Sequence, residues 1–104
     1  MKQMRQGDVF LQSVVAVPSG ATEITGDVIL AYGEVTGHAH QIKLPATERH
    51  KVRYWDAGAE RFLQVIERVA LTHEEHGEIV LDKGVYRQGF QVEDFGTEIK
   101  RVVD

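Results

Sequence analysis

The chain has 104 residues, of which 42% are apolar and 27% charged, and this ordinary globular usage predicts a single domain over residues 1–104. The net charge of −4 argues against a nucleic-acid partner, and the lack of cysteine excludes disulfides, thiolate metal sites and cysteine nucleophiles. No apolar run approaches the roughly 18 residues that span a bilayer. The first residues also lack the apolar segment of a signal peptide, so we expect a cytoplasmic protein with no membrane partner.

Short runs of Val, Ile, Leu, Tyr and Phe, separated by glycine-containing turns, predict an all-β fold. We expect a small barrel or sandwich of about eight short antiparallel strands. The expected strands cover residues 8–17, 27–34, 38–44, 52–56, 61–67, 69–73, 78–81 and 84–92. The stretch 14–25, with its proline and glycine, is typical of a loop.

The sequence makes more specific predictions for two connections between strands and for the C-terminal end. Residues 54–63 predict a hairpin around a short turn that contains Gly58. The sequence Asp82-Lys83-Gly84 predicts a second tight turn, because glycine adopts positive φ at little cost. Residues 97–104 are the best candidate for a short C-terminal helix, and the same residues are compatible with a final edge strand.

The most distinctive stretch is GEVTGHAHQI at residues 33–42. On a strand over residues 38–44, His38 and His40 share one face with Ile42 and Leu44, because side chains alternate with period two. Because Ile42 and Leu44 are apolar, we expect this face of the strand to point toward the core. Two imidazoles at this spacing, with roots roughly 6.5 Å apart, can converge on one ion at about 2.0–2.1 Å from each nitrogen.

A second cluster, LTHEEHG, occupies residues 71–77. His73 continues an apolar face, and His76 follows in a turn. The predicted metal ligands are therefore His38, His40, His73 and His76, with Glu34, Glu74 and Glu75 as carboxylate candidates and His50 a less favoured addition from a polar loop. Imidazole and carboxylate ligands suit Zn²⁺, Fe²⁺, Mn²⁺, Ni²⁺ or Cu²⁺, and the sequence leaves the metal identity open.

These motifs, with residues 79–86 and the final Arg101-Val102-Val103-Asp104, resemble a family of small uncharacterised proteins of bacterial and phage genomes. The resemblance runs from Arg5 to the C-terminus and implies no activity. The His-x-His pair followed by a later histidine is more distantly similar to cupins, which are small metal-binding β-barrels. That similarity implies a metal held by His38 and His40 together with His73 or His76.

Two functions remain open at this stage. The first is a β protein that binds a divalent metal or a small-molecule ligand, with a catalytic version in which Glu34 or Glu74 is a general base. The second is a non-enzymatic interaction module, such as a phage accessory protein, that forms a homo-oligomer and uses its histidines structurally. The substrate, the reaction and the pathway do not follow from the sequence.

Overall fold

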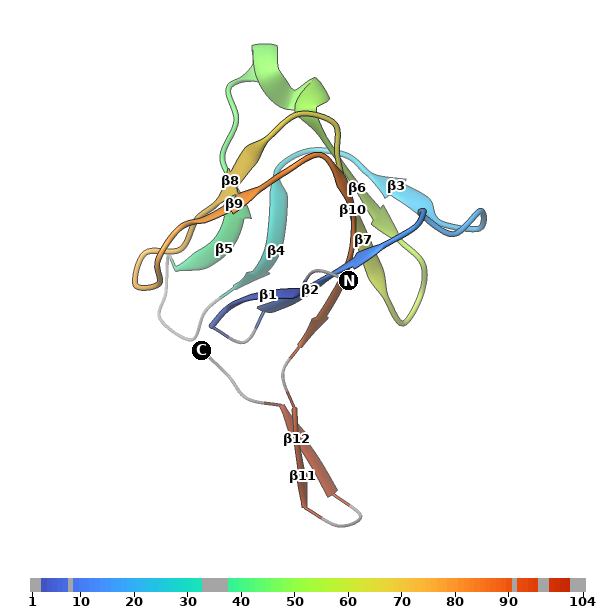
Figure 1. The fold of residues 1–104 in the computed structure, drawn as a ribbon, viewed down its shortest axis with the longest axis vertical. Helices are drawn as coiled ribbons and strands as arrows, with labels where there is room; N and C mark the ends of the chain where they lie inside the picture. The colour runs from blue at the N-terminus through green and yellow to red at the C-terminus, as the bar shows by residue number, and fades with distance from the viewer. Residues whose placement is uncertain (1–2, 8, 33–37, 91, 96–97, 102–104) are drawn as a thin grey trace.

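β-Strands supply nearly all the regular structure of the chain. The structure, a computed structural model, describes residues 3–7, 9–32, 38–90, 92–95 and 98–101 (Figure 1). The elements are β1 (Gln3–Gln6), β2 (Val9–Val14), β3 (Thr22–Ile24), β4 (Val28–Tyr32), β5 (Ala39–Ile42), the 3-10 helix η1 (Ala46–Lys51), β6 (Val52–Asp56), β7 (Arg61–Val65), β8 (Val69–Leu71), β9 (Ile79–Leu81), β10 (Gly84–Phe90), β11 (Val92–Phe95) and β12 (Glu98–Arg101). No helix in these described ranges is long and apolar enough to cross a membrane.

The main sheet has six antiparallel strands in the order β1-β2-β10-β7-β6-β3. The hairpins β4–β5 and β8–β9 lie across the core from this sheet, and a bridge between Gln41 and Thr72 joins them to each other (Figure 1). The hairpin β11–β12 projects from the rest of the chain (Figure 1). The all-β prediction is confirmed.

The main sheet follows the alternating pattern of its residues. In β2, Val9 and Leu11 are fully buried while Phe10 between them is only partly covered. In β6, Val52 and Tyr54 are buried and Arg53 between them is exposed. Since side chains on a strand point alternately to opposite faces, these residues build one apolar face for the core.

Two buried glutamines connect the layers. Gln88 of β10 donates from Nε2 to the carbonyl oxygen of Leu30 in β4 (2.8 Å), and its Oε1 accepts a hydrogen bond from the Tyr54 hydroxyl. Gln6 of β1 donates to the carbonyl oxygens of Leu71 (3.0 Å) and Gly77 (2.9 Å). Buried polar groups are stable only when their hydrogen bonds are satisfied, so these two residues fix how the layers face each other.

The barrel alternative is wrong. β1 and β3 are the two edges of an open sheet, and in the described part of the chain these edges do not pair with each other. The second layer consists of separate hairpins rather than strands that continue the main sheet around the core. The fold therefore has two facing layers, as in the sandwich alternative.

Several local predictions need correction. β3 forms within the stretch 14–25 that was expected to be a loop, and β1 was not predicted. The short connection at Asp82-Lys83 forms as predicted, and Gly84 has a positive φ of 156°. It passes between layers, because β9 pairs with β8 whereas β10 pairs with β2 and β7. In the described part of residues 97–104, β12 forms a strand, which contradicts the helix alternative. The hairpin at Gly58 is confirmed by the β6–β7 pairing.

Candidate metal centre

β5 and the loop after β8 run side by side and bring the two histidine motifs together. Gln41 and Thr72 exchange two backbone hydrogen bonds, of 3.0 Å and 2.8 Å. The antiparallel register therefore places His40, the residue before Gln41, opposite His73, the residue after Thr72. The two rings stack with their centroids 4.3 Å apart and their planes inclined by 30°.

The same register brings the next two pairs of residues into contact. Ala39 lies opposite Glu74, and its backbone N–H donates to Glu74 Oε1 at 2.8 Å. His38 lies opposite Glu75, with His38 Nδ1 at 3.8 Å from Glu75 Oε1. One backbone bridge thus aligns two sequence motifs that are more than thirty residues apart.

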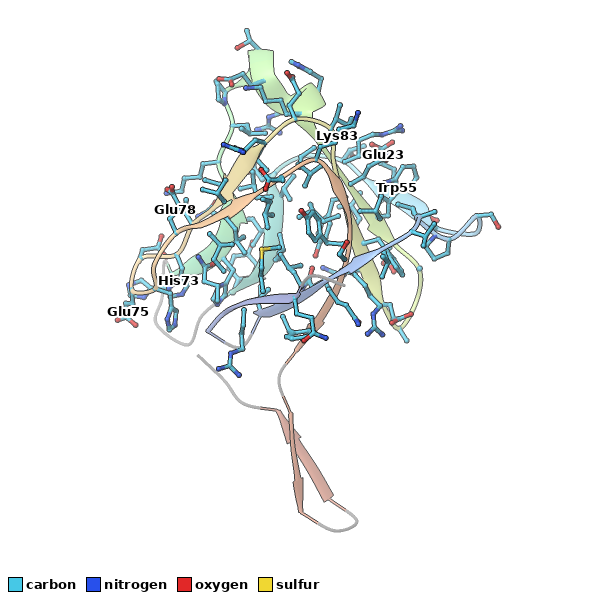
Figure 2. All side chains as sticks on the ribbon, in the orientation of Figure 1. Glu23, Trp55, His73, Glu75, Glu78 and Lys83 are labelled. Atoms are coloured by element: carbon cyan, nitrogen blue, oxygen red, sulfur yellow. The ribbon has the colours of Figure 1, made fainter. Side chains whose placement is uncertain are left out.

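His73 stands at the centre of the cluster. Its ring centroid lies 4.7 Å from that of His76 and 5.7 Å from that of His38, while His40 and His76 are 5.9 Å apart. Figure 2 shows His73 and Glu75 together where the loop between β8 and β9 turns. His40 is fully buried, whereas the side chain of His38 is 22% exposed, so the cluster extends from the core to solvent.

Gln6 sets the proton position on His40. The amide nitrogen of Gln6 donates to two carbonyl oxygens, those of Leu71 and Gly77, so Gln6 Oε1 must face His40. Gln6 Oε1 lies 2.8 Å from His40 Nδ1, and an oxygen acceptor at this position requires a proton on Nδ1. The neutral ring of His40 therefore carries its lone pair on Nε2, which is buried on the other side of the ring.

His73 has the opposite arrangement. The backbone N–H of Glu75 donates to His73 Nδ1 at 3.0 Å, so this nitrogen carries the lone pair and the neutral ring carries its proton on Nε2. A metal that binds Nδ1 must displace the Glu75 amide, and a metal that binds Nε2 requires the ring proton to move to Nδ1, which then no longer accepts from that amide. Binding at His73 thus involves the turn that follows it.

Three side chains offer ligand atoms close enough to hold one ion. One ligand atom each from His38, His73 and Glu74 lie within 4.8 Å of one another. The hydrogen bond from the Ala39 amide is the main reason that the pKa of Glu74 lies below its usual value; its own backbone amide and the neighbouring His38 and His73 lower it further. Glu74 is therefore a carboxylate, the form that a metal needs.

The structure brings together most of the predicted ligands. The rings of His38, His40 and His76 each contact that of His73, and His40 also contacts His76. Glu74 contacts Ala39 at the start of β5, and Glu75 contacts His38 just before it. Glu34, the other predicted general base, lies outside the described residues. His50 belongs to η1, where its Nε2 lies 3.2 Å from Glu67 Oε2 on the exposed surface.

The sequence reasoning missed Gln6. A glutamine in a short N-terminal segment carries no motif, and its role depends on contacts with residues that follow it by 34 to 71 positions. The alternation in β1 offered a weak signal, because Gln6 shares a face with the apolar Met4 and pairs with the buried Val9. A polar residue on a buried face requires a partner, but the sequence does not identify that partner.

A family model described as Domain of unknown function (DUF8820) matches residues 5–91, a range that contains the whole histidine cluster and ends before β11. This confirms the resemblance to an uncharacterised family, while the similarity to cupins stays a prediction. No curated protein and no solved structure matches the chain.

Proposed function

We propose that this chain, which belongs to the DUF8820 family, binds one divalent transition-metal ion at its histidine cluster. His38, His73 and Glu74 are the proposed protein ligands. The observation that supports the proposal is the approach of their ligand atoms to within 4.8 Å, from two segments that a single backbone bridge aligns. His40 and His76 contact His73 and are the candidates for a further ligand.

The spacing suits an ion after small side-chain movements. Ligand atoms at about 2.0–2.1 Å from a tetrahedral zinc ion lie roughly 3.3 Å from one another. Rotations about the exposed side-chain bonds of Glu74 and the partly exposed His38 can close this difference without moving β5. Two imidazoles and a carboxylate are ligands for Zn²⁺, Fe²⁺, Mn²⁺, Ni²⁺ and Cu²⁺ alike, so metal identity is a matter for measurement.

A three-ligand site would leave a coordination position for water or a small-molecule ligand, as in catalytic zinc sites. A site completed by His40 or His76 would instead be closed and structural. In the catalytic form, Glu34 is the proposed general base, since Glu74 then serves as a ligand. The number of protein ligands thus separates an enzyme from a metal-stabilised binding protein.

The first test is a titration of the metal-free protein with Co²⁺ and Zn²⁺, with the metal content measured by mass spectrometry and the Co²⁺ geometry by visible absorption. We expect about one equivalent to bind and the melting temperature to rise by mass action. His73→Ala and Glu74→Gln should lose this binding. His50→Ala and Glu78→Gln are matched controls, because His50 lies in η1 and Glu78 is an exposed residue outside the candidate ligand group.

A second readout follows from the hydrogen bond between the Glu75 amide and His73 Nδ1. Binding at His73 must break or reorient this contact, so the Glu75 amide resonance should shift strongly on addition of diamagnetic Zn²⁺. A titration with no bound metal and no shift of this resonance would contradict the proposal. That result would favour structural histidines and the alternative of a non-enzymatic interaction module, whose first test is the oligomeric state.

A further inference from the structure

A second candidate site lies away from the histidine cluster. It is a cavity of about 570 Å³ between the loop from β3 to β4, the end of β5 and the start of β6. This volume falls within the usual range of small-molecule pockets. Figure 2 shows Glu23, on the rim of the cavity, on the opposite side of the molecule from His73.

The floor of the cavity is apolar and belongs to both layers. It is lined by Ile24, Val28, Ile42, Leu44, Val52 and Tyr54. Ile42, Val52 and Tyr54 are among the buried core residues. The other three are only partly buried and pack against that core. The two layers therefore separate at this end and leave an apolar surface that a ligand can cover, with a gain in hydrophobic free energy.

The rim carries charges, and most of them are already paired. Asp27 Oδ1 accepts a hydrogen bond from Arg49 Nη2 at 2.7 Å. Glu23 accepts two hydrogen bonds from the guanidinium of Arg53, at 2.9 Å and 2.8 Å. Lys43 also lines the cavity, and it forms no ion pair with any carboxylate among the described residues.

We propose that this cavity binds a small amphipathic carboxylate, with its apolar body against the floor and its head group beside the ammonium of Lys43. The charge pattern favours an anion over a cation, because both rim carboxylates are engaged by arginines while Lys43 has a free positive charge within the described structure. A neutral ligand of the same shape would make the apolar contact with the floor but would gain no electrostatic attraction from Lys43. This site contains none of the histidines of the cluster, although Gln41, which pairs with Thr72 beside them, also lines the cavity.

The test uses three probes with the same eight-carbon chain, which are octanoate, octylamine and octanol. Each is titrated into ¹⁵N-labelled protein, and the amide shifts are mapped onto the sequence. We expect octanoate to bind at least about tenfold more tightly than octylamine, because the ammonium of Lys43 attracts the carboxylate of octanoate and repels the ammonium of octylamine. Its shifts should centre on the cavity residues and leave His73 and His76 unchanged.

Three variants sharpen the test. Lys43→Glu should weaken octanoate about tenfold, whereas Lys83→Glu changes the net charge equally at an exposed residue that does not line the cavity and should leave affinity unchanged. Leu44→Trp should fill the cavity and abolish binding of all three probes. Equal affinity for octanoate and octylamine, shifts centred elsewhere on the wild type, or equal effects of the two lysine variants would each overturn the proposal.

Discussion

Gln6 Oε1 lies 2.8 Å from His40 Nδ1, and the amide nitrogen of the same glutamine donates to two backbone carbonyls. Reversal of the amide would place Oε1 against those two carbonyl oxygens, so the orientation of Gln6 is determined by β8 and the loop that follows it. Gln6 thereby couples the edge of the main sheet to the proton position on a buried imidazole. Hydrogen bonds to the ring nitrogen that does not bind the metal orient metal-binding histidines in many proteins.

The first prediction is the tautomer of His40. Long-range ¹H–¹⁵N correlation spectra of the neutral ring should show the proton on Nδ1 and the lone pair on Nε2, whereas His73 should show the reverse because Glu75 donates to its Nδ1. Gln6→Ala should remove the preference at His40 and leave that at His73. A His40 ring protonated at Nε2 in the wild type would contradict the assigned role of Gln6.

Gln6→Ala should also lower the free energy of unfolding by at least about 2 kcal/mol, because a buried His40 nitrogen and two carbonyl oxygens each lose a partner. Chemical denaturation measures this change. Gln3→Ala is the control on the same strand, since Gln3 is exposed and should change stability little. An equal effect of both substitutions would show that β1, rather than the hydrogen bonds, is responsible.

Much of the fold could be predicted from local patterns. β6 was placed at its observed bounds, and β5, β7, β9 and β10 were placed within a few residues, because each combines β-branched or aromatic residues with flanking turn signals. β3 was missed because Thr22-Glu23-Ile24 has one apolar residue and forms a strand only by pairing with β6 at the edge of the sheet. Its stability comes from tertiary contacts that no local pattern records.

The sequence could indicate which histidines belong to the candidate site, but it could not indicate how they are arranged. Period-two alternation placed His40 on the inward face, where it is fully buried. Alternation could not show that Thr72 pairs with Gln41, and this pairing makes His73, at 4.3 Å between ring centroids, a closer neighbour of His40 than His76, at 5.9 Å. The register between segments thirty residues apart depends on the packing of the two hairpins.

The second prediction concerns the hydrogen-bonded pair of Tyr54 and Gln88 in the core. The Tyr54 hydroxyl donates to Gln88 Oε1, and burial raises the pKa of this phenol, which keeps it protonated as a donor. Tyr54→Phe should lower stability by about 1–3 kcal/mol, since it leaves a buried oxygen without its donor. Gln88→Leu should cost a similar amount, because the carbonyl oxygen of Leu30 then loses its partner.

A double-mutant cycle separates the pair from the rest of the core. The two substitutions together should cost less than the sum of the single effects, with a coupling of about 0.5–3 kcal/mol, because the residues contact each other directly. Phe10→Leu with Tyr54→Phe is a suitable control cycle, since Phe10 lies on the other face of β2. Strict additivity for Tyr54 and Gln88 would contradict their hydrogen bond.

The third prediction concerns Gly58 in the hairpin between β6 and β7. Gly58 has φ of 82°, a conformation that other residues adopt only with strain, and its N–H donates to Asp56 Oδ1 at 2.9 Å. Gly58→Ala should destabilise the protein by about 1–2 kcal/mol. Gly20→Ala is the matched control, because an added Cβ there meets no atom within 4 Å and the backbone is not left-handed. Equal melting temperatures for the two variants would refute the turn assignment.

The fourth prediction is a pH dependence at the edge of the main sheet. Two hydrogen bonds from Arg53 lower the pKa of Glu23 below its usual value of 4.5. A carboxyl whose pKa is lowered by folding stabilises the fold fully above the unfolded value, and this contribution is lost as the pH falls through the folded value. Glu23→Gln should therefore lower the melting temperature at pH 7, and its difference from the wild type should shrink toward pH 3.

Both groups of this ion pair are exposed, so salt should reduce the same difference through screening. Circular dichroism melts at pH 7 and pH 3, with and without added sodium chloride, measure both effects. Glu78→Gln makes the same charge change at an exposed residue outside the ion pair and is the control. A Glu23→Gln effect that stays constant from pH 7 to pH 3 would mean that β3 is held by packing of Ile24 against the core, and that its ion pair with β6 contributes nothing.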